Sequence, residues 1–147
     1  MDSPRHVYQV YIRTTPERLW QAITDPAFTE KYYYGTRVKS DWRAGSPLTY
    51  AYLDGTLAAD GEVLEALPPS RLVMTFRALW DPELAKEPPF RMIWEIEPAG
   101  PACRLTVTME DFVEGSRMAE QATGGMPVII SGLKTLLETG EPLVLSA

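Results

Sequence analysis

The 147-residue sequence contains a single cysteine, a single histidine and no long apolar run. One cysteine, Cys103, cannot form an internal disulfide, which is typical of proteins in a reducing compartment. No apolar stretch approaches the ~20 residues that a membrane-spanning helix requires. The first residues, MDSPRHVYQ, lack the basic and then apolar order of a secretory signal. We therefore expect a cytoplasmic protein.

Basic residues are also scarce, because 14 Lys and Arg stand against 20 Asp and Glu and give a net charge of -6. An acidic surface repels phosphate backbones and anionic lipids, so the composition argues against nucleic-acid partners and membrane-surface roles. Hydrophobic residues make up 45% of the chain, which is ordinary for a globular protein. The length suits one domain, which we expect to span residues 1–147.

The sequence offers few groups for metal or nucleotide chemistry. His6 and Cys103 lie far apart, and no set of His, Cys, Asp and Glu has the spacing of a metal site. There is no phosphate-binding loop, dinucleotide-binding glycine pattern or G-x-S-x-G. We therefore expect no metal and no cofactor. His6 is interpreted as a solvated residue near the first strand, and Cys103 as a small core residue.

Alternating apolar and polar residues are the dominant pattern in the chain. The alternation predicts seven strands, at residues 6–14, 36–41, 47–52, 60–66, 71–78, 90–97 and 102–110. In the last three, one face is apolar and the other is charged or hydroxylated. This pattern is typical of an antiparallel sheet that is covered on one face only.

Two short helices are expected after the first strand. Thr15-Pro16-Glu17 supplies a capping hydroxyl, a proline for the first turn and a carboxylate near the positive end of the helix dipole. Asp25-Pro26 ends this helix before a second short helix or turn.

A longer amphipathic helix is predicted over residues 124–140, with Gly125 and Pro127 at its start and Gly140 at its end. Such a helix is about 21 Å long and cannot cover seven strands tightly. We therefore expect a space between sheet and helix. The segments 79–89 and 111–123 are long for hairpin connections and are candidate lids.

This order of elements resembles the helix-grip fold of the START-like (SRPBCC) superfamily, and within it the branch named after the activator of the heat-shock chaperone's ATPase (AHSA-like). The likeness rests on residues 15–20, 40–46, 61–63 and 68–72 and on the closing SGLKTLLETG. The resemblance implies an α+β fold in which a curved antiparallel sheet of about seven strands wraps on a long C-terminal helix, with two short helices after the first strand. It leaves function open, because members of the superfamily bind, carry, cyclise or contact partners.

Two methionines depart from that branch. Met126 stands where the branch often has a tryptophan after paired glycines, and Met109 stands where a histidine is common. Both replace a rigid or polar group with a flexible apolar one, so we expect a softer pocket.

An apolar and aromatic set is the leading candidate for a binding site. Its members share the apolar parity of their strands or face those strands from the helix: Tyr50, Tyr52, Met74, Phe76, Met92, Trp94, Met109, Met126 and Ile130. Many belong to the core, and those near the wide end are expected to line a cavity for an apolar or aromatic ligand. The tyrosine hydroxyls and the Trp94 N–H are candidates to orient it. Trp80 and the triple tyrosine 32–34 are candidates to gate the pocket, to form a dimer contact or to bind another protein. For Tyr33, ordinary packing of the loop on the core is the expected role.

These observations lead us to expect a non-catalytic carrier or sensor of a hydrophobic small molecule. The alternative is a cyclase or dehydratase that uses an inward carboxylate or tyrosine. Glu62 and Glu65 lie on opposite faces of their strand, and the pattern does not decide which of them faces inward. A second alternative is a protein-interaction module such as a chaperone co-factor, and both a monomer and a homodimer fit the sequence.

Overall fold

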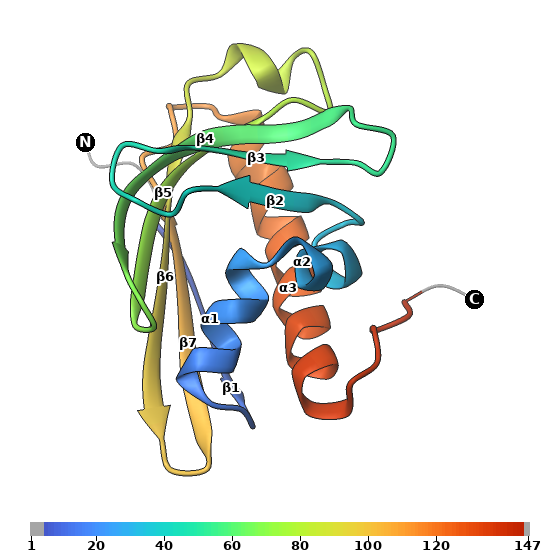
Figure 1. The fold of residues 1–147 in the computed structure, drawn as a ribbon. Helices are drawn as coiled ribbons and strands as arrows, with labels where there is room; N and C mark the ends of the chain where they lie inside the picture. The colour runs from blue at the N-terminus through green and yellow to red at the C-terminus, as the bar shows by residue number, and fades with distance from the viewer. Residues whose placement is uncertain (1–4, 146–147) are drawn as a thin grey trace.

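A curved antiparallel sheet wraps around helices in the computed structural model, which describes residues 5–145 (Figure 1). Residues 1–4 and 146–147 of the expected domain lie outside the described residues. The strands of the described chain are β1 (His6–Ile12), β2 (Arg37–Ser40), β3 (Pro47–Ala51), β4 (Leu57–Leu67), β5 (Arg71–Ala78), β6 (Phe90–Ala99) and β7 (Ala102–Glu110). Their order in the sheet is β1-β7-β6-β5-β4-β3-β2. The seven predicted strands and the helix-grip fold are confirmed.

The sheet bends sharply within β4. Figure 1 shows β2 and β3 running across the molecule, whereas β6 and β7 run along its length. Gly61 lies in β4, where a Cβ atom would stand only 1.9 Å from the Thr75 carbonyl oxygen. The neighbouring Glu62 N–H bonds the Thr75 hydroxyl at 3.0 Å, and the register with β5 shifts between Val63 and Glu65. A residue without a side chain therefore allows the two parts of the sheet to approach at this corner.

The outer face of the sheet carries cross-strand ion pairs, as the polar parity predicted. Arg77 holds both carboxylate oxygens of Asp60, at 3.0 and 2.8 Å. Arg71 bonds Glu95 at 2.7 Å, and Arg104 pairs with Glu97. These groups are partly exposed, so water and salt screen them and each pair contributes little to the stability of the fold.

The helices are α1 (Pro16–Thr24), α2 (Pro26–Tyr32) and α3 (Arg117–Thr139), with a short 3-10 turn, η1 (Leu84–Lys86), between β5 and β6. The predicted Thr15 cap is confirmed, since its hydroxyl accepts from the Arg18 N–H at 3.2 Å. Asp25, predicted only to end α1, also caps α2, because its Oδ1 accepts from the Ala27 N–H at 2.8 Å. All three helices lie on the concave side of the sheet (Figure 1). The cover is therefore broader than the single helix that the sequence suggested.

The predicted start of α3 was wrong by seven residues. The helix begins at Arg117, where the Ser116 hydroxyl accepts from the Ala119 N–H at 3.0 Å. Gly125 and Pro127, which the sequence placed at the start, lie inside the helix. At 23 residues, α3 is about 35 Å long. Most of the segment 111–123, predicted to be a lid loop, is thus helical.

A tertiary hydrogen bond accommodates Pro127 within α3. Proline has no N–H, so the carbonyl of Thr123, four residues earlier, receives no donor from within the helix. The Tyr8 hydroxyl of β1 donates to this carbonyl at 3.3 Å. The contact satisfies the acceptor that the proline leaves unpaired, which is how a helix can continue through a Gly-Gly-Met-Pro sequence.

The part of the core beneath α1, which we call the packed end, is filled by side chains. Leu19 and Ile23 of α1, Ile96 of β6, Leu105 of β7 and Leu133 of α3 are each at most 3% exposed. α1 packs on β6, and Ile96 and Leu105 are opposite one another in the sheet. At this end, side chains therefore fill the space between the sheet and the helices.

Candidate functional site

A cavity of about 700 Å³ lies between the bent half of the sheet and the first half of α3. This volume falls within the range of small-molecule binding sites. The deep wall consists of buried residues: Tyr33, Tyr50, Phe76, Phe90, Met92, Met109, Met126 and Ile129. We call this part of the molecule the cavity end.

Small residues explain why this end stays hollow. Ala58 and Ala59 of β4 line the cavity from the sheet, and Ala122, Gly124 and Gly125 line it from α3. Each contributes little volume where the packed end carries leucine and isoleucine. A helix that faces the sheet with alanine and glycine leaves space that the neighbouring side chains do not fill.

One wall of the cavity is a continuous row of aromatic rings. Tyr33 stacks on Tyr50 with ring centroids 4.6 Å apart, and Tyr50 lies 5.7 Å from Phe76. Phe76 in turn contacts Phe90 at 5.5 Å and Trp80 at 6.4 Å. The other lining is rich in methionine and comprises Met92, Met109, Met118 and Met126. The cavity thus combines a rigid aromatic surface with adaptable side chains.

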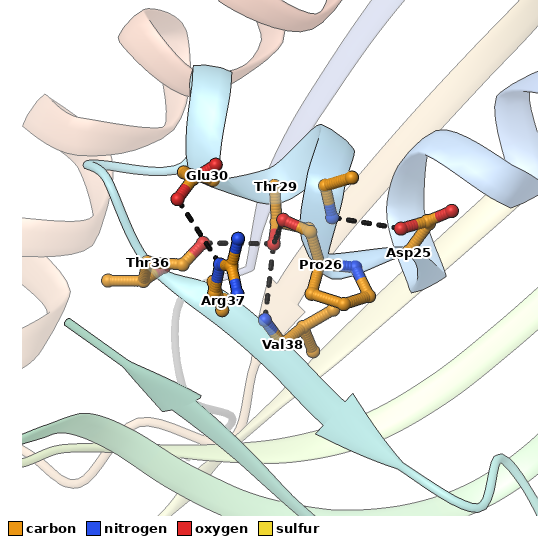
Figure 2. A network of polar contacts seen from close by, with 8 residues as sticks. Asp25, Pro26, Thr29, Glu30, Thr36, Arg37 and Val38 are labelled. Atoms are coloured by element: carbon orange, nitrogen blue, oxygen red, sulfur yellow. Dashed lines mark hydrogen bonds and ion pairs between the residues drawn. The ribbon is translucent and has the colours of Figure 1, made fainter. Parts of the chain in front are cut away.

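A buried polar network holds the start of this row in place (Figure 2). The Thr29 hydroxyl of α2 donates to the Thr36 carbonyl at 2.9 Å and accepts from the Val38 N–H of β2 at 3.1 Å. The Thr36 hydroxyl donates to the Tyr33 carbonyl at 2.6 Å. These bonds fix the chain between α2 and β2, and so they position the Tyr33 ring against Tyr50.

The tyrosines in the deep wall are neutral at physiological pH. Burial raises the pKa of Tyr33 well above its ordinary value, with a smaller contribution from the neighbouring Tyr50. Burial likewise raises the pKa of Tyr50, although its interaction with the Tyr33 side chain acts in the opposite direction. Neither phenol loses its proton near neutrality, so neither supplies a base there.

No carboxylate faces the deep part of the cavity among the described residues. Glu120 is the acidic residue of the lining, and it is exposed at the mouth. Glu62 is exposed, and Glu65 pairs with Arg71 at 3.4 Å. Neither of these glutamates lines the cavity. The sequence left open whether Glu62 or Glu65 faces inward, and in the structure neither of them does.

Exposed aromatic residues surround the mouth. Tyr34, Tyr52 and Trp80 line it and are 55%, 37% and 44% exposed. Tyr52 lies just beyond β3, whereas the sequence placed it in that strand. The Tyr34 hydroxyl donates to the Gly125 carbonyl at 3.3 Å, which joins the segment after α2 to the middle of α3.

Glu87 ties the 79–89 segment to the start of α3. Its carboxylate accepts from the Ser116 hydroxyl at 2.6 Å and from the Arg117 and Met118 N–H groups at 3.0 and 3.3 Å. A carboxylate at this position satisfies the unpaired amides of the first helical turn and interacts favourably with the helix dipole. The bond holds the first turns of α3 over the cavity.

The structure brings most of the predicted binding residues to the cavity. Those that line it are Tyr50, Tyr52, Phe76, Met92, Met109 and Met126. Met74, Trp94 and Ile130 do not. Met74 and Trp94 are buried farther along their strands, and the Trp94 Nε1 has no hydrogen-bond partner among the described residues. Strand parity predicted which face a residue occupies, but not its position along the sheet.

The lining residues that were missed or assigned differently include Tyr33, Phe90, Met118 and Ile129, the last of which lines the cavity in place of the predicted Ile130. Tyr33 was interpreted as loop-to-core packing, although it forms part of the deep wall. Phe90 begins β6, at the edge of the predicted alternation. Met118 fell in a segment expected to be a loop. Its helical spacing to Ala122, and from there to Met126, is the signal that identifies it.

Cys103 and His6 are the other side chains with reactive groups, and each one contacts a neighbouring residue of the fold. Cys103 is buried and its thiol donates to the Thr14 carbonyl at 3.2 Å, while burial and then Glu17 raise its pKa. His6 packs its ring edge-on against Phe112 at 5.8 Å. Within residues 5–145, no three His, Cys, Asp or Glu side chains are grouped as a metal site requires. None of the helices in that range is both long and apolar enough to cross a bilayer.

Comparison with known families gives one match. The family described as Activator of Hsp90 ATPase homolog 1-like protein matches residues 13–138. No protein with a curated description matches the sequence.

Solved structures share the fold at low sequence identity. Protein MLL2253 from Mesorhizobium loti is 24% identical with a TM-score of 0.76, over 91% of this chain and 96% of that one. The Aha1 dimer from Colwellia psychrerythraea is 18% identical with a TM-score of 0.73, over 93% and 98% of the two chains. PFC0360w, an HSP90 activator from Plasmodium falciparum, is 16% identical with a TM-score of 0.73, over 90% and 95%. At these identities the likeness shows the fold alone.

Proposed function

The chain belongs to the family of Activator of Hsp90 ATPase homolog 1-like proteins, and from that premise we propose that it binds an uncharged hydrophobic small molecule as a carrier or sensor. The observation that carries this proposal is the cavity of about 700 Å³ with its aromatic and methionine-rich lining. Apolar concave sites of this size are the usual places where proteins hold small ligands. The setting we propose is the cytoplasm, as the single cysteine suggested.

The absence of a charged group in the deep wall of the described chain defines the ligand further. An ionised ligand would lose its hydration there without gaining a partner of opposite charge, which is strongly unfavourable. A neutral ligand exchanges water for aromatic and thioether contacts. The cavity therefore favours neutral compounds over carboxylates, phosphates and amines.

Binding is favoured over cyclase or dehydratase chemistry by the same residues. A carboxylate base would have to face the cavity, but Glu62 is exposed and Glu65 is paired with Arg71. The Tyr33 and Tyr50 phenols stay protonated near neutrality, because burial raises the pKa of each. They suit hydrogen bonding to a ligand better than proton abstraction.

Titration with the neutral dye Nile red tests the proposal. We expect one dye per chain and an increase in its fluorescence as it enters an apolar site. The variant Met126→Trp should lower the affinity at least tenfold, because an indole would occupy part of the cavity. The matched control Ser131→Trp places the same side chain at an exposed position of α3 outside the lining and should leave the affinity unchanged. Equal affinities for all three proteins would rule out binding in this cavity.

A second candidate is a chaperone co-factor, and the family match is the observation that favours it. One of the structures with this fold is an HSP90 activator. The test is a pull-down with the chaperone at near-physiological salt, followed by its ATPase assay. Co-purification together with a faster ATPase rate would support this candidate, and the absence of both would remove it. Light scattering in the same buffer distinguishes a monomer from a homodimer.

A further inference from the structure

The deep wall of the cavity contains one pair of hydroxyls, those of Tyr33 and Tyr50. Tyr50 is 1% exposed and lies on β3 between Val38 of β2 and Ala59 of β4. Its ring is held between Tyr33 on one side, at 4.6 Å, and Phe76, at 5.7 Å. Two strands and two rings therefore fix the direction of the Tyr50 hydroxyl.

The Tyr33 and Tyr50 rings are stacked, and each phenol affects the pKa of the other. Among the described residues, no backbone or side-chain acceptor lies at hydrogen-bonding distance from the Tyr50 hydroxyl, although the residue is only 1% exposed. A buried donor without an acceptor is unfavourable, so a ligand acceptor placed next to it in the cavity would be bound favourably.

The other polar groups of the lining either have a hydrogen-bond partner or are exposed to water. The Thr36 hydroxyl donates to the Tyr33 carbonyl, and the Gly125 carbonyl accepts from Tyr34. Gln121 and Glu120 are exposed at the mouth, where water competes for them. Polar recognition in the deep part thus falls to the tyrosine pair.

Resting on the binding function proposed above, we infer that the Tyr50 hydroxyl is the polar recognition group of the cavity and that the ligand is a neutral, flat aromatic compound with a hydrogen-bond acceptor such as a carbonyl. The row of rings from Tyr33 through Phe76 to Trp80 supplies the stacking surface for a flat body. The free proton of Tyr50 selects compounds that place an acceptor next to it.

The experiment uses two compounds of nearly equal shape, 9-fluorenone and fluorene, which differ in one carbonyl group. Their affinities are measured by displacement of Nile red from the full-length protein. The wild type should bind fluorenone about fivefold more tightly than fluorene, which is the effect of one net hydrogen bond. The variant Tyr50→Phe should bring that ratio close to one while the affinity for fluorene is retained. Tyr11→Phe, an exposed position on β1, is the matched control and should keep the wild-type ratio.

The infrared carbonyl stretch of bound fluorenone gives a readout that needs no variant. A hydrogen bond from Tyr50 lowers this frequency relative to fluorenone in an apolar solvent, and Tyr50→Phe should restore it. If wild type binds both compounds equally and the stretch is unshifted, the role of Tyr50 is wrong although the binding function stands. If neither compound nor Nile red binds, the binding function and this inference are both overturned.

Discussion

At the packed end, Leu133 of α3 is fully buried, whereas one heptad earlier on the same helix Met126 borders an open cavity. The two residues lie on the same face of one helix and oppose the same sheet. The difference comes from what surrounds them. Leu19 and Ile23 of α1 help to fill the packed end, while alanine and glycine line the cavity end. A ligand cavity here results from missing side-chain volume rather than from a different fold.

The packed end and the cavity end of the sheet also have different roles. The packed end supplies stability, because its aliphatic side chains leave water completely. The cavity end gives up part of this burial and gains a binding surface. The bend within β4 makes this division geometrically feasible, because it turns β2 and β3 away from β6 and β7 (Figure 1).

The largest effect is expected when the bend itself is removed. In Gly61→Ala the new methyl group would meet the Thr75 carbonyl oxygen at 1.9 Å, and both atoms belong to paired strands. We expect a loss of about 3 kcal/mol or more in the free energy of unfolding, measured by urea denaturation. An unchanged stability would mean that the two strands separate easily and that the bend does not depend on glycine.

The next effect compares the two ends directly. Leu133→Ala should lower the free energy of unfolding by about 3 kcal/mol, because it opens a cavity in close-packed surroundings. Met126→Ala should lower it by only about 1 kcal/mol, since its side chain already borders empty space and loses fewer contacts. Equal losses in urea denaturation would show that the cavity end is as tightly packed as the other.

A smaller effect is expected at the bond between Glu87 and α3. Glu87→Ala removes an acceptor that holds the Ser116 hydroxyl and the first amides of the helix. The free energy of unfolding should fall by about 1–2 kcal/mol. Amide hydrogen exchange should accelerate in the first turns of α3.

The control for this loss is Glu83→Ala on the same segment. Glu83 forms an exposed ion pair with Lys86 at 3.3 Å, so its removal should change stability by less than about 0.5 kcal/mol. Faster exchange at the C-terminal end of α3 in Glu87→Ala would contradict a local role for this bond.

The smallest effect is a gain. Gly124→Ala places a methyl group where nothing lies within 4 Å, so the higher helix propensity of alanine should stabilise the protein by about 0.5–1 kcal/mol. Gly132→Ala is the contrast, because its methyl group would meet Cβ of Tyr32 at 3.2 Å where α3 crosses α2. Thermal unfolding should show a clear increase for the first variant and a smaller one, or a decrease, for the second.

The sequence predicted the sheet well because alternation is a local signal that every strand carries. The buried residues of β5 and β6 follow the predicted parity apart from Val73 and Ile93, and the helix cap at Thr15 is where the sequence placed it. The first seven residues of α3 were not predicted, because Gly124, Gly125 and Pro127 disfavour a helix interior. The Tyr8 hydroxyl bonds the Thr123 carbonyl that Pro127 leaves without a donor. Tyr8 lies 115 positions from Thr123, so no local pattern contains this contact.

The binding site was only partly predictable for a similar reason. Parity places Tyr50 and Trp94 on the same side of the sheet, but only Tyr50 reaches the cavity. Which of them does so depends on the bend in β4 and on where α1 lies, and both are tertiary features. The role of Tyr33 depends on the Thr29 network, which joins residues from two elements (Figure 2).

The proline inside α3 also has a consequence for motion. A helix normally unravels cooperatively because each turn is bonded to the next, and Pro127 removes one of those links. The turns before it cover the cavity and are held from outside by Tyr8, Tyr34 and Glu87. We therefore expect these turns to open as a separate unit of low local stability while the C-terminal turns stay protected. Local opening of these turns would let a ligand enter and leave the cavity while the rest of the protein stays folded.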